Sequence, residues 1–325
     1  MLKEIIMSEI SINYLTKNVK LIFEKDIINA EWRFLDRSRH YFVITDTNIA
    51  NLYEDILSLI PNLKSILVIK AGEKAKSIHV YKKIIKSLIK FKISKDDTLI
   101  VFGGGVINDL ASFVASTYLG GIDYVLIPTT LVAQVSAALS ERCYLDIDVK
   151  NAISVISHPL AIIIDPTILK TLSQSEFEDG IAEIIKYGMI KDKTILQEIS
   201  DHKITINTIN FYYLLEKCIN IKIALETNPK DKNLANFGLL YGKIIRQLST
   251  NELSYGRLLA IGMYYELQNE ELRFELKSIL KLYNLDTYLS KWNINYQKYI
   301  AKQNTSYETI EIKSMGNAEL VFHQN

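Results

Sequence analysis

The sequence predicts an α/β amino-terminal domain built on a parallel, Rossmann-like sheet, followed by a mainly α-helical domain. Short β-branched runs alternate with helical patterns up to about residue 165, and this alternation is typical of a parallel sheet covered by helices. After Pro166 the apolar residues recur at helical spacing, with few strand-like runs. We therefore place a domain boundary near residue 168, which gives domains of residues 1–168 and 169–325.

Five apolar runs predict the strands of the first domain. They lie at 41–46 (YFVITD), 65–72 (SILVIKAG), 97–105 (DTLIVFGGG), 123–130 (DYVLIPTT) and 160–166 (LAIIIDP). The last two are apolar enough to be buried on both faces. Helices are expected at 51–60 and 80–91 in the first domain, and within 172–190, 207–226 and 256–276 in the second.

The composition is that of an ordinary globular protein with a small-molecule ligand. Of 325 residues, 38 are Lys or Arg and 37 are Asp or Glu, so the net charge of +1 does not suggest binding to nucleic acid or to a membrane surface. Cys143 and Cys218 lie far apart without CxxC spacing, which fits free thiols in a reducing compartment. No signal-peptide core and no run of about 18 apolar residues is found. We expect a cytoplasmic protein.

Polar residues and glycines follow four of the predicted strands, at the carboxyl ends where open α/β sheets bind ligands. These tips are Asp46 and Asn48, Gly72 to Lys76, Gly103 to Gly105, and Thr129 with Thr130. Three adjacent glycines before a helix let backbone N–H groups approach an anion, and the helix dipole favours negative charge there. Two structural alternatives stay open: the glycines serve only tight packing, and Asp109 is a first-turn residue stabilised by the dipole.

Taken in order, the motifs VITDTN, GEKAKS, GGGVINDLASFVASTYLGG, PTTLVAQV, VKN, LKTLSQSEFEDGIAEIIKYG and NFG resemble those of the dehydroquinate synthases and the wider family of sugar phosphate cyclases. The match runs from about residue 41 to residue 265. The resemblance implies that the first domain binds NAD, that the helical domain holds a divalent metal, usually zinc, and that a phosphorylated sugar acid binds between them. In the family, NAD oxidises a ring hydroxyl, phosphate is eliminated, the ketone is reduced again and the opened product closes into a carbocycle. The resemblance also implies a homodimer.

The resemblance assigns NAD contacts to residues on both sides of the domain boundary. The matching positions are Asp46, Asn48, Glu73, Lys76, Gly103, Gly104, Gly105, Asp109, Thr129, Thr130, Lys150, Thr171, Leu172 and Glu176. Any one of them alone is equally a polar residue that caps a strand or helix. So many positions in register predict NAD as the cofactor.

The metal site departs from the family pattern. The family holds its metal with a Glu in AExIKYG and with two histidines, in NxGHxxGH and HGExxxxGM. Glu183 retains the first ligand, but Leu239 and Tyr255 occupy the two histidine positions. Leucine has no lone pair to donate, and a phenol is a poor zinc ligand at neutral pH. We therefore expect no catalytic zinc, with Glu183 as the only surviving family ligand.

The substrate positions are partly retained. Positive charge persists at three of them, Arg142, Lys232 and Lys243, although each differs from the family residue. Asn151, Lys186, Lys222 and Asn236 match outright, and Lys186 lies one helical turn from Glu183. Against these, Ser136 replaces the Asp of QVDSS, AALSER replaces the SSxGGK loop, and Gly120 replaces the Arg of TYxRG. Lys232 and Lys243 are equally interpretable as surface lysines.

These features lead to a first hypothesis, a divergent NAD-dependent enzyme that oxidises a phosphorylated sugar or sugar acid without metal, with elimination still possible. The candidate catalytic residues are Lys186, Tyr255, Lys222 and Asn236, with Lys186 or Tyr255 as the base, through a pKa lowered by burial or by a neighbouring cation. The phosphate-side residues are Arg142, Asn151, Lys232 and Lys243.

A second hypothesis is a catalytically inactive relative that keeps NAD and acts as a scaffold or sensor. A third is a glycerol phosphate dehydrogenase or an iron-type alcohol dehydrogenase, which have a similar fold. Those enzymes also need histidine ligands, and GEKAKS together with IKYG favours the cyclases.

Overall fold

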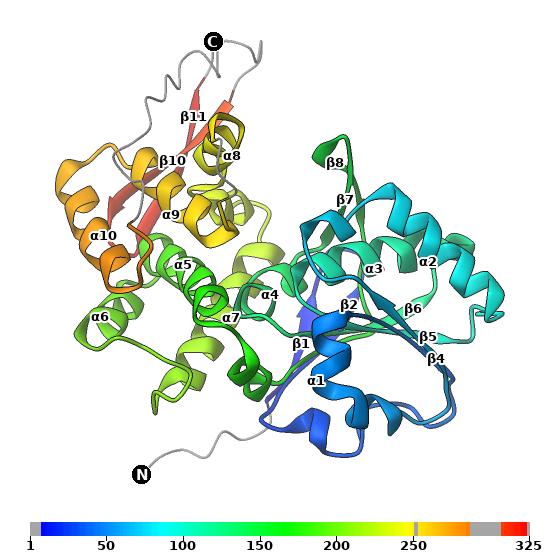
Figure 1. The fold of residues 1–325 in the computed structure, drawn as a ribbon. Coiled ribbons are helices and arrows are strands. Elements are labelled where there is room, and N and C mark those ends of the chain that lie inside the picture. Colours follow the sequence, from blue (N-terminus) through cyan, green and yellow to red (C-terminus); the bar gives the residue numbers. More distant parts are fainter. Residues whose placement is uncertain (1–7, 250–252, 287–306, 324–325) are drawn as a thin grey trace. The chain divides into compact units, whose positions relative to one another are not determined.

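The computed structural model describes residues 8–249, 253–286 and 307–323. The chain separates into two compact units, Met1–Thr171 and Leu172–Asn325 (Figure 1). An α/β unit is followed by a mainly helical one, which confirms the predicted fold class. No helix in the described segments is both long and apolar enough to cross a bilayer.

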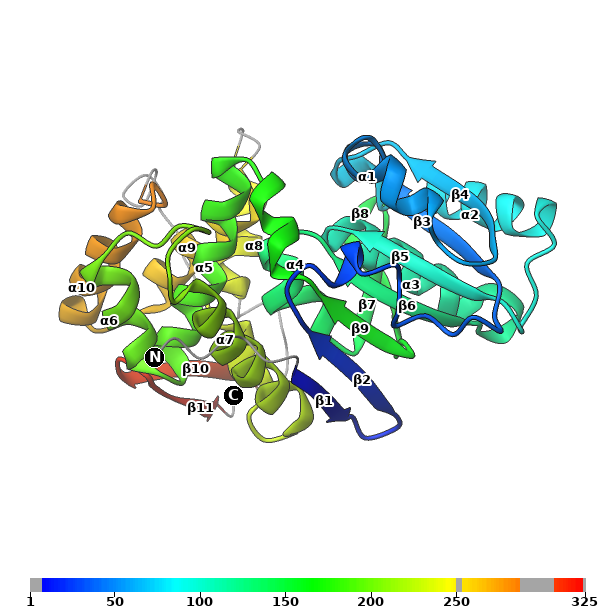
Figure 2. The same ribbon diagram turned by 90° about the horizontal axis from the view of Figure 1, so that it is seen from below.

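The first unit is built on a seven-stranded sheet with the order β1-β2-β9-β6-β5-β3-β4. The strands are β1 (Ser8–Asn13), β2 (Asn18–Phe23), β3 (Tyr41–Asp46), β4 (Leu63–Ile69), β5 (Thr98–Gly103), β6 (Asp123–Pro128) and β9 (Ala161–Ile164). All pairings are parallel except β1 with β2, which form one edge of the sheet (Figure 2). Every residue of β3 and β5 is buried, as expected for central strands covered on both faces. The β1–β2 pair was not predicted.

Helices cover the two faces of this sheet. Helix α1 (Thr47–Ser58) lies on one face, and α2 (Ile78–Lys90) and α3 (Gly105–Thr117) lie on the other (Figure 1). Right-handed crossovers produce this arrangement, because the chain moves outward from β3 to β4 and then reverses across the sheet to β5. On the α1 face, the core includes Trp32, Phe102 and Ile163, and the Trp32 Nε1–H donates to the carbonyl of Ile56 at 2.8 Å.

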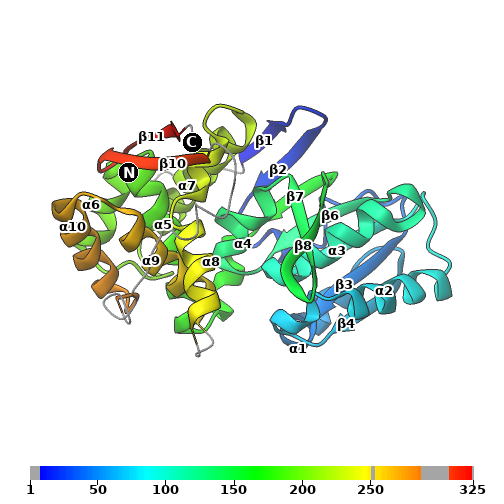
Figure 3. The same ribbon diagram turned by 90° about the horizontal axis from the view of Figure 1, so that it is seen from above.

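A β-hairpin formed by β7 (Arg142–Ile147) and β8 (Val149–Ile156) packs on α3 (Figure 3). The short helix α4 (Leu131–Val135) and the 3₁₀ turn η4 (Ala137–Leu139) precede the hairpin, and two further 3₁₀ turns, η2 (Glu73–Ala75) and η5 (Pro166–Thr171), follow β4 and β9. The side chains of Cys143 and Leu145 are buried on one face of β7. Asp148, in the left-handed region with a φ of 55°, forms the turn between the two strands.

The second unit is a group of helices around α5 (Gln174–Ile190). The others are α6 (Lys193–Asp201), α7 (Phe211–Thr227), η6 (Lys232–Asn236), α8 (Leu239–Leu248), α9 (Tyr255–Glu266) and α10 (Glu270–Leu282). A capping box between Ser173 and Glu176 starts α5. Almost every residue from Phe177 to Ile190 is buried, because neighbouring helices surround α5. A second hairpin, β10 (Tyr307–Ser314) with β11 (Asn317–His323), packs against α5 and η6.

Candidate functional site

The strand order of the sheet reverses between β3 and β5, and this position predicts a ligand-binding edge. The chain leaves β3 in one direction to β4 and returns past it to β5, so the strand order reverses between these two strands. Open α/β sheets bind ligands at such a switch point, beyond the carboxyl ends of the strands. Asp46 ends β3 and Gly103 ends β5, so two of the predicted cofactor positions lie at this point.

The three glycines have different surroundings. A Cβ on Gly103 would come within 2.6 Å of Ile107, and one on Gly104 within 2.9 Å of Thr130, so both glycines permit close packing of α3. A Cβ on Gly105 would only reach ordinary contact with Ala137, at 3.8 Å. Gly104 is the N-cap of α3 and has no side chain to accept from the first N–H groups. The packing interpretation of the motif is confirmed, and its role in binding an anion at the uncapped helix start stays a prediction.

Lys76 is the centre of a group of polar side chains in the first unit. Its side chain is buried, and Nζ lies 2.9 Å from Asp109 Oδ2 and 2.6 Å from Asn151 Oδ1. Asp146 is 3.8 Å away and also accepts from the backbone N–H of Asn151. Burial raises the pKa of Asp109, an effect that the Lys76 charge and the Tyr144 backbone N–H oppose. Asn151, expected on the substrate side, thus contacts one predicted cofactor position, Lys76, which in turn pairs with a second, Asp109.

The other predicted residues of this unit mostly support local structure. Asp46 caps α1 by accepting from the N–H groups of Asn48 and Ile49, and Thr130 caps α4. The remaining predicted positions have these contacts: Lys150 pairs with Glu73 at 2.6 Å, the Thr129 N–H donates to the Gly103 carbonyl, the Thr171 hydroxyl donates to the Ile168 carbonyl, and Arg142 is exposed and donates to Ser154. Asn48 is exposed at the start of α1.

In the second unit, Glu183 is the centre of a fully buried cluster. Its side chain is 0% exposed, and that of Lys186, one turn along α5, is 2% exposed. Lys186 Nζ lies 2.6 Å from Glu183 Oε2, while the Tyr255 hydroxyl donates to Oε1 at 2.5 Å. Oε1 therefore accepts a hydrogen bond from Tyr255, whereas Oε2 is in ion-pair contact with the Lys186 ammonium without a well-oriented hydrogen bond.

Asp179, which the sequence interpretation missed, fixes the start of α9 and with it Tyr255. The Ser254 hydroxyl donates to Asp179 Oδ1 at 2.6 Å. A Cβ on Gly256 would come within 2.3 Å of the Asp179 Cα, so α5 and α9 approach closely only because residue 256 is glycine. Asp179 and Glu183 lie four residues apart on α5, which places them on the same face. This spacing was a signal present in the sequence.

The electrostatics of the cluster correct one expectation. Burial and the Glu183 carboxylate raise the pKa of Tyr255 well above its ordinary value, so the prediction of a lowered phenol pKa is wrong. The phenol faces an anion at close range, and its hydroxyl donates to that anion. Burial alone would raise the pKa of Glu183, but the charge of Lys186 and the Tyr255 hydroxyl hold it below the ordinary value.

A second buried cluster lies on α7 and η6. Lys222 Nζ is 3.4 Å from Glu226 Oε2, and Lys232 Nζ is 3.8 Å from Oε1 of the same carboxylate. Lys222 is 5% exposed and Glu226 8% exposed. Burial lowers the pKa of Lys222, an effect that the Lys186 charge adds to and Glu226 opposes. Glu226 was also missed, although its spacing of four residues from Lys222 indicates a pair on one helix face.

The remaining predicted positions of this unit are exposed, half-buried or part of a helix cap. Asn236, at the end of η6, and Lys243, on α8, are exposed. Leu172 is half-buried before α5, and Glu176 is engaged in the capping box with Ser173.

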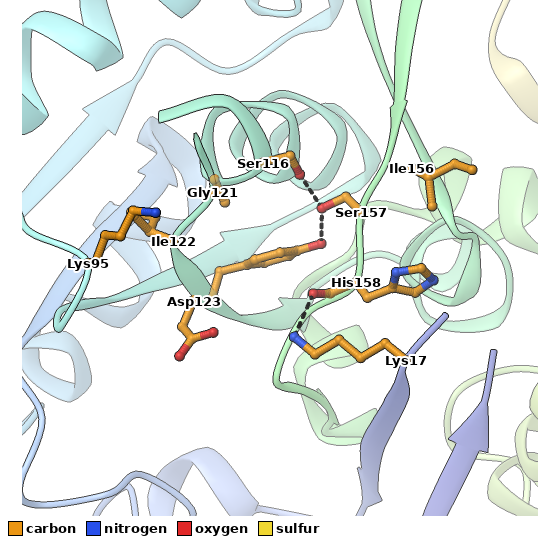
Figure 4. Close-up of a pocket in the computed structure, with 11 residues that line it drawn as sticks. Lys17, Lys95, Ser116, Gly121, Ile122, Asp123, Ile156, Ser157 and His158 are labelled. Carbon is orange, nitrogen blue, oxygen red and sulfur yellow. Dashed lines mark hydrogen bonds between the residues drawn. The ribbon is translucent and has the colours of Figure 1, made fainter. Parts of the chain in front are cut away.

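The first unit has a surface cavity of about 370 Å³, which we call the outer cavity. Its lining includes Lys17, Lys95, Asp123, Ser157 and His158 (Figure 4). Asp123 begins β6, so this cavity is at the amino-terminal edge of the sheet, opposite the glycine turn. It does not contain the predicted site residues.

Comparison with known proteins identifies the family. Residues 66–179 match the 3-dehydroquinate synthase N-terminal family, and residues 180–312 match its C-terminal counterpart. The chain belongs to the 3-dehydroquinate synthase family. It is 35% identical to the 3-dehydroquinate synthase of Clostridium botulinum, over 86% of each chain, and 36% identical to that of Clostridium kluyveri, over 80% of this chain and 76% of the relative.

Solved structures agree on the fold. A 2-deoxy-scyllo-inosose synthase in complex with carbaglucose-6-phosphate, NAD⁺ and Co²⁺ has a TM-score of 0.81 at 17% identity, over 98% of this chain and 97% of that one. A 2-epi-5-epi-valiolone synthase from Streptomyces hygroscopicus, with NAD⁺ and Zn²⁺ bound, has a TM-score of 0.82 at 18% identity, over 94% and 92%. Both share the two-domain architecture found in this chain.

The residues of this chain do not fit the family's metal. Glu183 is the only retained metal ligand of the family. One of its oxygens accepts a hydrogen bond from Tyr255, and the other is paired with the Lys186 ammonium. In the part of the chain that the structure describes, no three His, Cys, Asp or Glu side chains are placed to hold a metal ion together. Zinc sites in enzymes use three protein ligands, mostly nitrogen or sulfur. Here a single carboxylate, Glu183, is contacted by an ammonium and a phenol, and this arrangement does not supply the three ligands of a zinc site.

Proposed function

We propose that this member of the 3-dehydroquinate synthase family uses NAD, without a divalent metal, to transform a phosphorylated sugar or sugar acid by oxidation, with elimination as a possible second step. The observation that carries the proposal is the closed Glu183 cluster, in which Lys186 and Tyr255 engage both carboxylate oxygens. A metal at Glu183 would have to displace a buried ammonium and a buried hydroxyl. The retained Lys186, Lys222 and Asn236 support a remaining catalytic role.

The residues of the first unit fit NAD. The uncapped start of α3 suits the pyrophosphate, and Asp46 and Asp109 are acceptors suited to ribose hydroxyls. Bound NAD would supply a hydride acceptor. In the same proposal, Arg142, Lys232 and Lys243 supply positive charge for the substrate phosphate.

Lys222 is the best candidate for the base that accepts the hydroxyl proton. A general base must be neutral before it accepts a proton, and burial lowers the pKa of Lys222 in that direction. Tyr255 is unsuited, because its hydroxyl already donates to Glu183 and its pKa is raised. Lys186 is paired with Glu183 at 2.6 Å, more closely than Lys222 with Glu226 at 3.4 Å, so we assign Lys186 a positioning role within the cluster.

One observation favours the second hypothesis, an inactive NAD-binding relative that acts as a scaffold or sensor. Glu183 and Lys186 neutralise each other and are 0% and 2% exposed, so neither presents a free charge to a substrate. Substitution Lys186→Met separates the two cases. An enzyme loses turnover with this variant, whereas a scaffold keeps its biological role as long as the variant folds.

Two measurements on the purified protein test the proposal. Elemental analysis should find no stoichiometric metal, and calorimetric titration should find one NAD site per chain. NAD reduction and phosphate release are then followed over a panel of phosphorylated sugars and sugar acids, with and without a chelator. Turnover that survives the chelator supports the proposal. Stoichiometric zinc, or turnover abolished by the chelator and restored by zinc, contradicts it.

A designed variant provides a matched control for the metal measurement. Leu239→His combined with Tyr255→His restores the family's residue types at the two positions that lack histidine, so on this proposal the variant should acquire zinc that the original chain lacks. Tyr255→Phe, which removes the hydroxyl without adding a ligand, should acquire none. We also propose the homodimer that the family resemblance implies, and light scattering coupled to size-exclusion chromatography tests it.

A further inference from the structure

The side chain of Asn108 on α3 is buried without partners. It is 3% exposed, and neither its Oδ1 nor its Nδ2 has a hydrogen-bond partner in the described segments of the chain. Leaving both halves of an amide unpaired in the interior is strongly unfavourable. Native proteins satisfy nearly all such groups, and ordered water is a common partner where no protein atom is available.

Asn108 lines a second cavity of about 10 Å³, which we call the inner cavity. This volume is close to the room that one water molecule needs. The lining is polar enough to hold it, because Asp109, Ser140 and Arg142 also contribute. Apolar cavities stay dry, whereas a cavity with several donors and acceptors binds water.

The inner and outer cavities are separated by hydroxyl groups. Tyr124 and Ser157 line both cavities, and their oxygens are 2.5 Å apart. The Ser116 hydroxyl also contacts the Ser157 oxygen at 2.5 Å (Figure 4). Asn108, Ser112 and Ser116 follow each other at intervals of four residues, so they form a polar stripe on one face of α3. The hydroxyl groups of Tyr124 and Ser157, which line both cavities, therefore lie between Asn108 and the outer cavity.

We propose that the inner cavity binds a water molecule that hydrogen-bonds to Asn108 and donates to the carboxylate of Asp109. Asp109 is a predicted NAD contact, so this inference rests on the proposed cofactor site. Burial raises the pKa of Asp109, and each donor that reaches its oxygens opposes that effect. The bound water would be a third donor beside Lys76 and the Tyr144 N–H, and would keep the carboxylate charged to accept from a ribose hydroxyl.

Other charged and titratable groups surround Asp109. Asp146 raises its pKa, Arg142 lines the same cavity, and Cys143 on β7 is a buried thiol with a pKa raised to about 12. Since Asp146 and Arg142 are both on the hairpin, a substitution on α3 leaves them in place. Asn108 is therefore the appropriate residue to change.

A crystal structure of the full chain, at a resolution that shows ordered water, tests the site directly. We expect water within hydrogen-bond distance of Asn108 and of Asp109. A dry inner cavity, or an Asn108 amide bonded only to protein, overturns the proposal. This result does not depend on NAD, so a protein that fails to bind NAD refutes the proposed function and leaves the water site to be decided separately.

Three variants on α3 test the consequence by calorimetric titration with NAD. Asn108→Leu fills the cavity with an apolar side chain, so it should displace the water and weaken NAD binding roughly tenfold. Asn108→Ala leaves room for water beside Asp109 and should bind NAD nearly as the original chain does. Thr117→Val, on the same helix but outside both cavities, is the matched control and should not change the affinity. Equal losses in the Leu and Ala variants, or no loss in the Leu variant, contradict the role assigned to the water.

Discussion

Removal of the Lys186 ammonium is the sharpest test of the Glu183 cluster. Lys186→Met keeps the length and helix propensity of the side chain but leaves a carboxylate that is 0% exposed without its cation. Breaking a buried ion pair by removing one partner costs about 3–5 kcal/mol, because the remaining charge is uncompensated. We expect a loss of this size in the free energy of unfolding, measured by urea denaturation, with hydrogen exchange of α5 to localise it.

Two controls separate this effect from other causes. Lys191 at the end of α5 pairs with Asp231 at 2.8 Å, but these side chains are 33% and 38% exposed, so Lys191→Met should cost only about 0–1 kcal/mol. The double variant Glu183→Gln with Lys186→Met removes both charges and should recover most of the loss. A loss below about 1 kcal/mol for Lys186→Met, or no recovery in the double variant, would refute the buried pair.

The pH dependence of the same variant follows from the lowered pKa of Glu183. Folding favours the ionised form of this carboxyl, so its contribution to stability is present above the unfolded pKa and is lost as pH falls through the folded value. In Lys186→Met, the Glu183 carboxyl has no cation beside it, so it avoids the cost of a buried charge by binding a proton. The difference in stability between the two proteins should therefore shrink from pH 7 towards pH 4. A constant difference over this range would mean that Glu183 does not titrate as described.

Three further predictions concern residues of α9, namely Tyr255, Gly256 and Glu266. Tyr255→Phe removes the donor to Glu183 and should cost about 1–3 kcal/mol in urea denaturation, with no measurable loss counting against the hydrogen bond. Gly256→Ala forces a Cβ within 2.3 Å of the Asp179 Cα and should cost about 1–3 kcal/mol of thermal stability, so an unchanged melting temperature would contradict the close approach. Burial raises the pKa of Glu266 from 4.5 to about 8, so the folded state binds the proton more tightly and this group makes stability fall as pH rises between those values. Glu266→Gln should flatten that part of the stability profile, and a slope equal to that of the original chain would argue against it.

The fold was predictable because its signals are local. Apolar runs such as YFVITD give buried central strands, and the change to helical spacing after Pro166 separates the two parts of the chain. The β1–β2 pair was not predicted, since β1 is the edge strand, β2 is its neighbour, and both mix polar with apolar residues. An edge strand buries too little surface to produce a continuous apolar run.

The hydrogen-bond partners of the site residues were harder to predict, because they depend on packing between segments that are distant in sequence. The loss of both family histidines is visible at Leu239 and Tyr255, but the sequence does not reveal that the Tyr255 hydroxyl meets Glu183. The predicted lowering of its pKa failed for that reason. The prediction assumes a phenol near a cation, whereas the fold buries the Tyr255 phenol against the Glu183 carboxylate.

The charge balance of the Glu183 cluster determines which chemistry remains available to the helical unit. A divalent cation would accept a lone pair from a substrate hydroxyl and lower its pKa directly, whereas an ammonium group can only donate hydrogen bonds. Lys186 therefore balances the charge of Glu183 without replacing the Lewis acid. In the proposed oxidation, the hydroxyl proton must then go to a base, and Lys222 is a buried amine whose pKa is lowered towards that role. If neither Lys222 nor a metal supports turnover, the closed cluster is structural and the protein acts through binding alone.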